Sequence, residues 1–587
     1  MSKLLKYLEK KDWLFIIIIL GLVVFQVVMD LSLPEYTSSL TTVVSSGQAT
    51  MDDVWANGGK MLLCAGASMI ASIIAGYFAA RVAANFSKNI RTGIFVAVER
   101  FSIEEMNHFS PASLITRTTN DVVQIQTVVA MGLQVLIKAP ILAVYAISKI
   151  YSSDIIWTQT VVIAVAIMLT IICTILVFTY SKFKQIQKLT DELNGITREN
   201  VSGVRVIRAF NAETYQQSKF EKINEKVTKN NLYTGTATGI IMPILQAIMS
   251  GLTLAIYLVG AYLMQNAQIS KRVDLLGEMT AFSQYALQIV MAFLMLVVIF
   301  AILPRAIVAG KRIREVIDTK ITILDGQEVD GTNELCGEIE FQGVSFAYPN
   351  AKSETLSDIS FKVSKGETLA IIGGTGSGKT SLVQLIPRFF DTSKGQILFN
   401  GRNVKEYTQE ALRERIGYVT QKAVLFQGTI EDNICYGSKN PLDQQRLEQA
   451  LVISNAKEFV SKLSNGVKSA VSQGGTNFSG GQKQRLSIAR AIYKKPEVLI
   501  FDDSFSALDY KTDQFVRREI KQNAKDSTVI IVAQRISTIM QADKIIVLED
   551  GKIAGLGSHQ ELLNTCEVYQ SIAKSQLSEE ELKNEEV

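Results

Sequence analysis

One short stretch decides the fold of the C-terminal half, and it reads Leu369-Ala370-Ile371-Ile372-Gly373-Gly374-Thr375-Gly376-Ser377-Gly378-Lys379-Thr380-Ser381. It has the form G-x-x-x-x-G-K-[ST], with an apolar strand before it and a predicted helix after it. Glycines let successive backbone N–H groups converge on phosphate oxygens, Lys379 reaches the β and γ phosphates, and Thr380 offers a hydroxyl to Mg²⁺. The stretch therefore predicts a nucleoside triphosphate site formed by Gly373 to Ser381, with Thr380 as a metal ligand.

A second apolar strand, Val498-Leu499-Ile500-Phe501, ends at Asp502. A carboxylate at that strand end suits the same Mg²⁺ as Thr380. From Gly337 onward, short β-branched runs alternate with helix-length segments, which is typical of an α/β domain. We therefore expect an α/β P-loop domain at 337–575 and a charged tail at 576–587.

The first half of the chain is apolar. The 587 residues are 48% hydrophobic and 20% charged, which is apolar for a soluble enzyme. Five charge-free stretches approach or exceed the roughly 20 residues that a bilayer requires, and a sixth is interrupted only by Lys138; they cover 13–29, 61–80, 122–148, 155–181, 230–270 and 279–304. We expect an α-helical six-span transmembrane domain at 1–315, followed by a polar linker at 316–336.

Lysine and arginine near the spans predict their orientation. They gather before the first span and in the segments 81–121 and 182–229, whereas the segment 30–60 carries four acids and only Lys60. We therefore expect both termini in the cytoplasm, 30–60 as an outer loop, and a multi-pass protein of the plasma membrane. The two basic segments contain few glycines or prolines, so they are predicted to continue the spans as helices.

Three further features bear on partners. Lys138 lies at membrane depth and is therefore a functional candidate; the alternative is a lysine that reaches an interface or a wet cavity without contacting substrate. The net charge is only +4, so nucleic acid is not expected as a partner. The five cysteines form no C-x-x-C pair, which indicates neither a disulfide framework nor a zinc site.

The most specific motif is Asn477-Phe478-Ser479-Gly480-Gly481-Gln482-Lys483-Gln484-Arg485. Here the sequence resembles the ATP-binding cassette (ABC) transporter family, whose signature is L-S-G-G-Q, with Phe478 in place of the leucine. In that family the signature completes the ATP site of the opposite cassette. The resemblance therefore implies that two cassettes pair head to tail and that Ser479, Gly480, Gly481 and Gln482 contact ATP bound to a partner.

Other positions match the same family. Tyr348 corresponds to the aromatic residue that stacks on adenine, Gln421 to the glutamine that contacts Mg²⁺, and Asp509 to the end of the D-loop at the dimer interface. The six spans before the α/β domain resemble a B-type (type IV) exporter half-transporter, and the segments 116–121 and 199–210 resemble the coupling regions of that family. The resemblance implies ATP and Mg²⁺ as cofactors, with Thr380, Gln421 and Asp502 at the metal.

Two positions depart from the family at the reaction centre. Asp503 stands where a glutamate normally polarises the attacking water, and Gln534 stands where a histidine contacts the γ-phosphate. A carboxylate one methylene shorter is displaced by about 1 Å, which can lower a rate by about 10²-fold. We interpret Asp503 and Gln534 as the catalytic positions of a degenerate ATP site that hydrolyses slowly; neutral drift is the alternative.

These features predict ATP-driven export of amphipathic drugs or lipids by one half of a heterodimer. The second, different half-transporter would hydrolyse most of the ATP, at a site completed by the intact signature of this chain, as in bacterial heterodimeric multidrug exporters. Methionine and aromatic residues in the spans fit small amphipathic substrates within membrane lipid, although they equally fit helix packing. The alternatives are an exporter of a specific peptide or lipid, and a regulatory or ATP-gated channel half.

Overall fold

The computed structural model describes residues 2–46, 50–151, 155–331, 335–349, 351–438 and 441–577. The chain divides into two compact units, one formed by Met1–Glu99 and Pro111–Asp318 and the other by Arg100–Ser110 and Thr319–Val587. The predicted linker 316–336 and tail 576–587 lie partly outside the described residues, at 332–334 and 578–587. The predicted boundaries at 315, 336 and 575 stay predictions.

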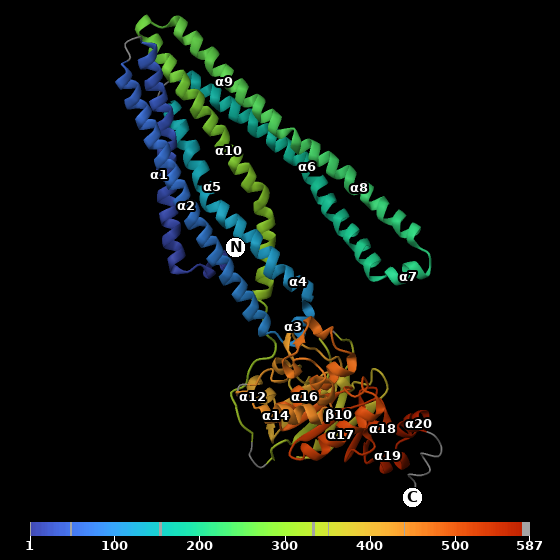
Figure 1. Ribbon diagram of the computed structural model, residues 1–587. Helices are drawn as coiled ribbons and strands as arrows, with labels where there is room; N and C mark the ends of the chain where they lie inside the picture. The colour runs from blue at the N-terminus through green and yellow to red at the C-terminus, as the bar shows by residue number, and fades with distance from the viewer. Residues whose placement is uncertain are drawn as a thin grey trace. The chain divides into compact units, whose positions relative to one another are not determined.

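The first unit is helical (Figure 1). Its elements are η1 (Ser2–Tyr7), α1 (Lys10–Ser45), α2 (Met51–Glu99), α4 (Pro111–Thr116), the π-helix η2 (Arg117–Asp121), α5 (Val122–Tyr151), α6 (Ile155–Ser202), α7 (Val204–Ala209), α8 (Glu213–Gly239), α9 (Ile241–Asn266) and α10 (Ile269–Ile317). Within the described residues, six helical segments are long and apolar enough to cross a bilayer. They confirm the predicted number of spans.

The segment 30–60 is largely helical, so the expectation of a loop over its whole length was wrong, while its outward side stays a prediction. Helix α1 continues to Ser45 and α2 begins at Met51. Leu31 and Pro34 are buried in α1, so this stretch has apolar surface to bury beyond its first acid, Asp30. The end of the charge-free run at Met29 is therefore not the end of the helix, because α1 continues for 16 residues beyond it, to Ser45.

The two basic segments confirm the expected helical extensions. Helices α2 and α6 continue without interruption to Glu99 and Ser202. Figure 1 shows α6 and α8 running side by side as far as the short helix α7. Helices α1, α2, α5 and α10 pack on one another, while α9 packs on α6 and α10. The first unit therefore contains two helix groups that meet through α9 and α10.

The second unit is α/β, which confirms the predicted fold class. Its strands are β1 (Ile339–Phe346), β2 (Leu356–Val363), β3 (Thr368–Gly373), β4 (Lys394–Phe399), β5 (Arg402–Asn403), β6 (Ile416–Val419), β7 (Gly428–Thr429), β8 (Ala470–Val471), β9 (Val498–Asp502), β10 (Thr528–Val532), β11 (Lys544–Glu549) and β12 (Lys552–Gly557). Its helices are α3 (Ile103–His108), α11 (Lys379–Leu385), α12 (Gln409–Glu414), α13 (Ile430–Ile434), α14 (Gln444–Ile453), α15 (Lys457–Ser461), η4 (Gly466–Lys468), η5 (Gln473–Gly475), α16 (Gly480–Tyr493), α17 (Tyr510–Asn523), α18 (Ile536–Ile539), α19 (His559–Thr565) and α20 (Glu567–Gln576).

Two sheets form the frame of this unit. The larger has the order β12-β11-β3-β10-β9-β6, in which all pairs except β11–β12 are parallel. The smaller, antiparallel sheet has the order β2-β1-β4-β5. One apolar core includes residues of β1, β2 and β4 together with β3, β9, β10 and α11, so it joins the two sheets. Strands β9 and β10 are buried throughout, as expected for parallel strands covered on both faces.

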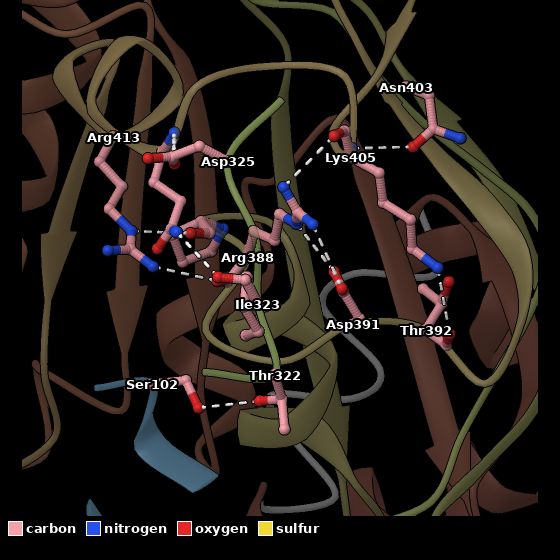
Figure 2. A network of polar contacts seen from close by, with 12 residues as sticks. Ser102, Thr322, Ile323, Asp325, Arg388, Asp391, Thr392, Asn403, Lys405 and Arg413 are labelled. Atoms are coloured by element: carbon pink, nitrogen blue, oxygen red, sulfur yellow. Dashed lines mark hydrogen bonds and ion pairs between the residues drawn. The ribbon is translucent and has the colours of Figure 1, made fainter. Parts of the chain in front are cut away.

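A polar network fixes the segment that enters the second unit (Figure 2). Gln409 donates to the Ile323 carbonyl at 3.3 Å and to Asp325 at 2.9 Å. The Arg413 guanidinium donates to the carbonyls of Pro387 and Arg388, each at 3.1 Å. Because these bonds satisfy partly buried backbone carbonyls, they hold the loop after α11 and the entering segment in one arrangement.

The segment Arg100–Ser110 is attached to the same unit by a buried carboxylate. Glu105 accepts hydrogen bonds from the Thr322 backbone at 3.0 Å and the Thr322 hydroxyl at 2.7 Å, and it also caps its own helix at Ser102. Burial alone raises the pKa of Glu105, but the hydrogen bonds from Ser102 and Thr322 together bring this pKa below its usual value. Glu105 is therefore held as a carboxylate by neutral donors.

Candidate nucleotide site

The candidate site lies where four parallel strands end. Strands β3, β10, β9 and β6 run in the same direction, so the residues that follow them meet at one edge of the sheet. These residues are the loop 373–378, Gln534, Asp502 with Asp503, and Gln421. The sheet therefore brings together residues that are up to 161 positions apart, from 373 to 534.

The glycine-rich loop has the backbone that its sequence predicts. Gly376 and Gly378 have φ angles of +86° and +99°, which favour glycine. A Cβ atom on Gly373 would lie 2.1 Å from the Leu548 carbonyl oxygen, so no larger residue fits there. Lys379 donates to the carbonyls of Gly373 and Gly374 at 2.8 and 2.7 Å, and burial lowers the pKa of its ammonium group.

Thr380 and Asp502 are in direct contact. The Thr380 hydroxyl donates to one oxygen of Asp502 at 2.9 Å, and the Tyr418 hydroxyl donates to the other, also at 2.9 Å. Asp502 is only 3% exposed, and this burial raises its pKa. Sequence reasoning missed Tyr418, whose only signal is its position near the end of strand β6.

The donor set at this edge fits Mg²⁺ bound together with a nucleotide. Among the described residues no group of three His, Cys, Asp or Glu side chains could hold a metal by itself. One hydroxyl and one carboxylate are present, at Thr380 and Asp502. Mg²⁺ is usually held by one or two protein oxygens together with phosphate and water, so these two residues suffice for the protein part of such a site.

Both departures from the family meet at Asp503. Its Oδ2 atom accepts hydrogen bonds from Gln421 Nε2 at 3.0 Å and from Gln534 Nε2 at 2.9 Å. Its backbone has a φ of +49°, and its N–H donates to the Val532 carbonyl at 3.0 Å. The carboxylate is therefore fixed at the end of β9 by a strand neighbour and two neutral amides.

Tyr348 and Ser381 also come together. The Tyr348 hydroxyl and Ser381 Oγ lie 2.8 Å apart, which connects the end of β1 to the first turn of α11. The Tyr348 ring packs edge-on against Phe346 and Phe390, with centroids 4.9 and 5.3 Å away. The predicted adenine-stacking residue is therefore held next to the glycine-rich loop.

The signature segment caps its own helix. Ser479 accepts from the Gln482 N–H at 3.3 Å, and Gln482 Oε1 accepts from the Ser479 N–H at 2.9 Å, so α16 begins with a capping box. Phe478 is buried in the helical core formed with α13 to α15. Ser479 and Gly480 are exposed, and among the described residues no hydrogen bond joins them to the loop 373–378 of the same chain.

Asp509 caps the start of α17, as Ser479 caps the start of α16. Its carboxylate accepts from the Thr512 N–H at 3.0 Å and from the Thr512 hydroxyl at 2.8 Å. These hydrogen bonds lower the pKa of Asp509. The predicted site residues therefore fall into two sets, one gathered at the sheet edge and one at the exposed starts of α16 and α17.

Comparison with known proteins agrees with both units. The family described as "ABC transporter transmembrane region" matches residues 16–293, and the family described as "ABC transporter" matches residues 356–506. The uncharacterized ABC transporter ATP-binding protein Rv1273c of Mycobacterium tuberculosis is 37% identical over 522 residues, 88% of each chain. The ATP-dependent lipid A-core flippase of Aromatoleum aromaticum is 30% identical over 592 residues, 98% of this chain and 96% of that protein.

The fold has also been seen in solved structures. A bacterial Atm1-family ABC exporter with ATP bound superposes with a TM-score of 0.80 over 96% of this chain and 98% of that chain, at 22% sequence identity. Six apolar helices followed by a P-loop domain define a multi-span membrane transporter with an ATP-hydrolysing domain. The chain belongs to the ABC transporter family, and its fold is that of a type IV exporter.

Proposed function

We propose that this chain is the degenerate-site half of a heterodimeric ABC exporter. The observation that supports the proposal is the hydrogen bonding of Asp503 to Gln421 and Gln534, at 3.0 and 2.9 Å. Neither amide can carry a positive charge to the γ-phosphate, and the Asp503 side chain is one methylene shorter than a glutamate. A site with these residues would bind ATP and hydrolyse it slowly.

The binding machinery beside Asp503 is complete, which favours retained ATP binding. In this proposal the backbone of 373–378 and Lys379 hold the phosphates, and Tyr348 packs on the adenine. Thr380, Asp502 and Gln421 hold Mg²⁺, which would neutralise phosphate charge. Ser381 positions Tyr348 through their 2.8 Å contact. Asp503 orients water, and Gln534 holds Asp503.

The partner is proposed to be a second, different half-transporter. The first turns of α16 and α17 are capped by the side chains of Ser479 and Asp509. Among the described residues, neither turn has a hydrogen bond to the loop 373–378 of its own chain. Ser479 to Gln482 and Asp509 would complete the ATP site of that partner, where most hydrolysis would occur. Two copies of this chain would instead pair two slow sites.

The transported compounds are proposed to be small amphipathic molecules, taken from membrane lipid across a plasma membrane, with both termini of this chain in the cytoplasm. The lipid A-core flippase is one relative whose own substrate is an amphiphile. A further relative, described as a putative multidrug export protein of Bacillus subtilis, is 30% identical over 508 residues, 84% of each chain. Both favour this substrate class.

The test is ATP hydrolysis by the purified chain alone and by the chain co-purified with the half-transporter encoded beside it. We expect the chain alone to be nearly inactive and the pair to be active. Replacing the glutamate after the Walker B aspartate of the partner should remove most of the turnover and leave only a slow residual rate, whereas Asp503→Asn in this chain should leave most of it. Full, drug-stimulated activity of the chain alone would refute the degenerate-site proposal.

A further inference from the structure

Helix α1 has a break in its own hydrogen bonding. Pro34 lies inside the helix, and a proline has no N–H to donate to the carbonyl four residues earlier. That carbonyl belongs to Asp30. Gln288 Nε2 of α10 lies 3.4 Å from the Asp30 carbonyl oxygen, and the Tyr285 hydroxyl of α10 donates to the Leu31 carbonyl at 3.1 Å. Gln288 of α10 therefore supplies a donor for the carbonyl that Pro34 leaves without one, and Tyr285 makes a second contact beside it.

The orientation of Gln288 supports this assignment. Its Oε1 atom is buried and has no hydrogen-bond partner among the described residues. The amide thus directs its donor to the Asp30 carbonyl while its own acceptor stays unsatisfied. An unsatisfied buried acceptor is unfavourable, so the contact with the broken part of α1 decides how this side chain points.

The side chain of the same residue joins two more helices. Lys138 of α5 forms an ion pair with Asp30 Oδ2 at 3.0 Å, and the Ser68 hydroxyl of α2 donates to Asp30 Oδ1. The two charged side chains are only 21% and 23% exposed. Lys138 also lies two residues before Pro140, the proline inside α5. One residue of α1 therefore contacts α2, α5 and α10 beside two proline-containing stretches.

A charge pair between two apolar helices needs a reason. An isolated ammonium or carboxylate in a membrane span is strongly unfavourable, so charges there face the bundle interior and pair with each other. Apolar side chains alone would let α1 and α5 pack equally well. They would not tie the Asp30 position, where α1 lacks one backbone hydrogen bond, to Lys138 of α5 and Ser68 of α2 by directional contacts, and they would leave α1 free to bend there.

We propose that Asp30 and Lys138 are positioning residues for export, whose ion pair anchors α1 to α5 directly before the break at Pro34, so that α1, α2, α5 and α10 move as one unit at that point. The ends of α1 and α5 beyond the two prolines then follow the rest of the helices when ATP binding drives the transport cycle. Without the pair, the outer part of α1 bends independently, and ATP hydrolysis continues with less transport.

The test uses the full chain in its assembled transporter, in lipid nanodiscs. Spin labels replace Val44 of α1 and Tyr151 of α5, both exposed positions beyond the prolines, in a variant without the five native cysteines. Distances are measured without nucleotide and after trapping with ATP and vanadate. We expect one narrow distribution in both states, and a broad, nucleotide-dependent distribution in Lys138→Met.

The matched control is the second ion pair between the same helices. Lys149 and Glu35 lie 2.5 Å apart and are 36% and 48% exposed. Lys149 is closer to both labels than Lys138 along the helices, so a larger effect of Lys138→Met than of Lys149→Met does not come from proximity. In ethidium efflux from vesicles, Lys138→Met should export about fivefold less per ATP hydrolysed. Couplings between distant sites in proteins typically amount to a factor of about five or more.

Two further variants separate positioning from simple charge balance. Lys138→Arg keeps the pair and should restore both the narrow distribution and the export per ATP. Asp30→Asn combined with Lys138→Met removes both charges and should stay defective. If that neutral double variant behaves like the unmodified protein, or if distances and export per ATP do not change in Lys138→Met, the proposal is wrong.

Discussion

Asp503 and Asp30 each collect hydrogen bonds from segments far apart in the sequence, but with different donors. Asp503, at the sheet edge, accepts from the neutral amides of Gln421 and Gln534. Asp30, in helix α1, accepts from the Lys138 ammonium and the Ser68 hydroxyl. A carboxylate held by amides can exchange its partners without leaving a buried cation behind. A carboxylate held by an ammonium cannot do so. The Asp503 arrangement therefore suits a site that a ligand reorganises, and the Asp30 arrangement suits a fixed contact between helices.

The largest effect in this comparison is expected for Asp30→Asn. The change leaves the Lys138 ammonium without an acid. Breaking a fully buried ion pair lowers the free energy of unfolding by about 3–5 kcal/mol. Because both side chains are about one-fifth exposed, we expect this free energy to fall by about 2 kcal/mol. Reversible unfolding in mixed detergent micelles measures it. Glu35→Gln, in the more exposed pair with Lys149, should cost less than about 1 kcal/mol, and equal losses would contradict the distinction.

The sequence predicted one of these aspartates and not the other, for a physical reason. Asp503 lies directly after a strand whose end is fixed by parallel pairing, so a local motif was enough to place it beside the glycine-rich loop. Asp30 pairs with Lys138 across 108 positions, and nothing in the local sequence records that contact. The charge-free stretch that predicted the first span ends just before Asp30, whereas the helix continues to Ser45 and packs against α10 and α5.

The same contrast holds for the other contacts. The six spans and the α/β order were predictable because hydrophobic runs and strand–helix alternation are local patterns. Tyr418, which donates to Asp502 at 2.9 Å, was not, because its role depends on β6 pairing with β9. The attachment of Glu105 to Thr322 depends likewise on tertiary packing between distant segments.

A buried carboxylate with neutral donors should give an intermediate effect, and Glu105 provides the test. Glu105→Gln keeps the shape but loses acceptors for Ser102 or Thr322, which should cost about 1 kcal/mol, the value of one hydrogen bond. Hydrogen exchange of the amides of 102–106 and of Thr322, corrected for intrinsic rates, should accelerate about fivefold. An effect as large as that of Asp30→Asn would show that burial, rather than the charge of the donor, sets the loss.

The pH dependence of the Glu105 contacts follows from the direction in which the pKa of Glu105 is shifted. The hydrogen bonds to Ser102 and Thr322 hold the pKa of Glu105 below its usual value of 4.5. A carboxyl whose pKa is lowered on folding adds stability above the unfolded pKa and loses it as the pH falls through the folded pKa. Protection of Thr322 should therefore decrease below about pH 4.5 in the unmodified protein and change less in Glu105→Gln.

The smallest effect on stability is expected for Asp503→Asn. The asparagine oxygen can accept from both Gln421 and Gln534, as Asp503 Oδ2 does, and neither donor is charged, so the free energy of unfolding should change by less than about 0.5 kcal/mol. Hydrolysis should nevertheless fall, because an amide cannot polarise the attacking water as a carboxylate does. With the partner's Walker B glutamate replaced, so that only this site turns over, we expect the residual ATPase rate to drop by about tenfold or more. An unchanged residual rate would mean that Asp503 takes no part in the chemistry, whereas a large loss of stability would mean that its two amide contacts hold the fold rather than the site.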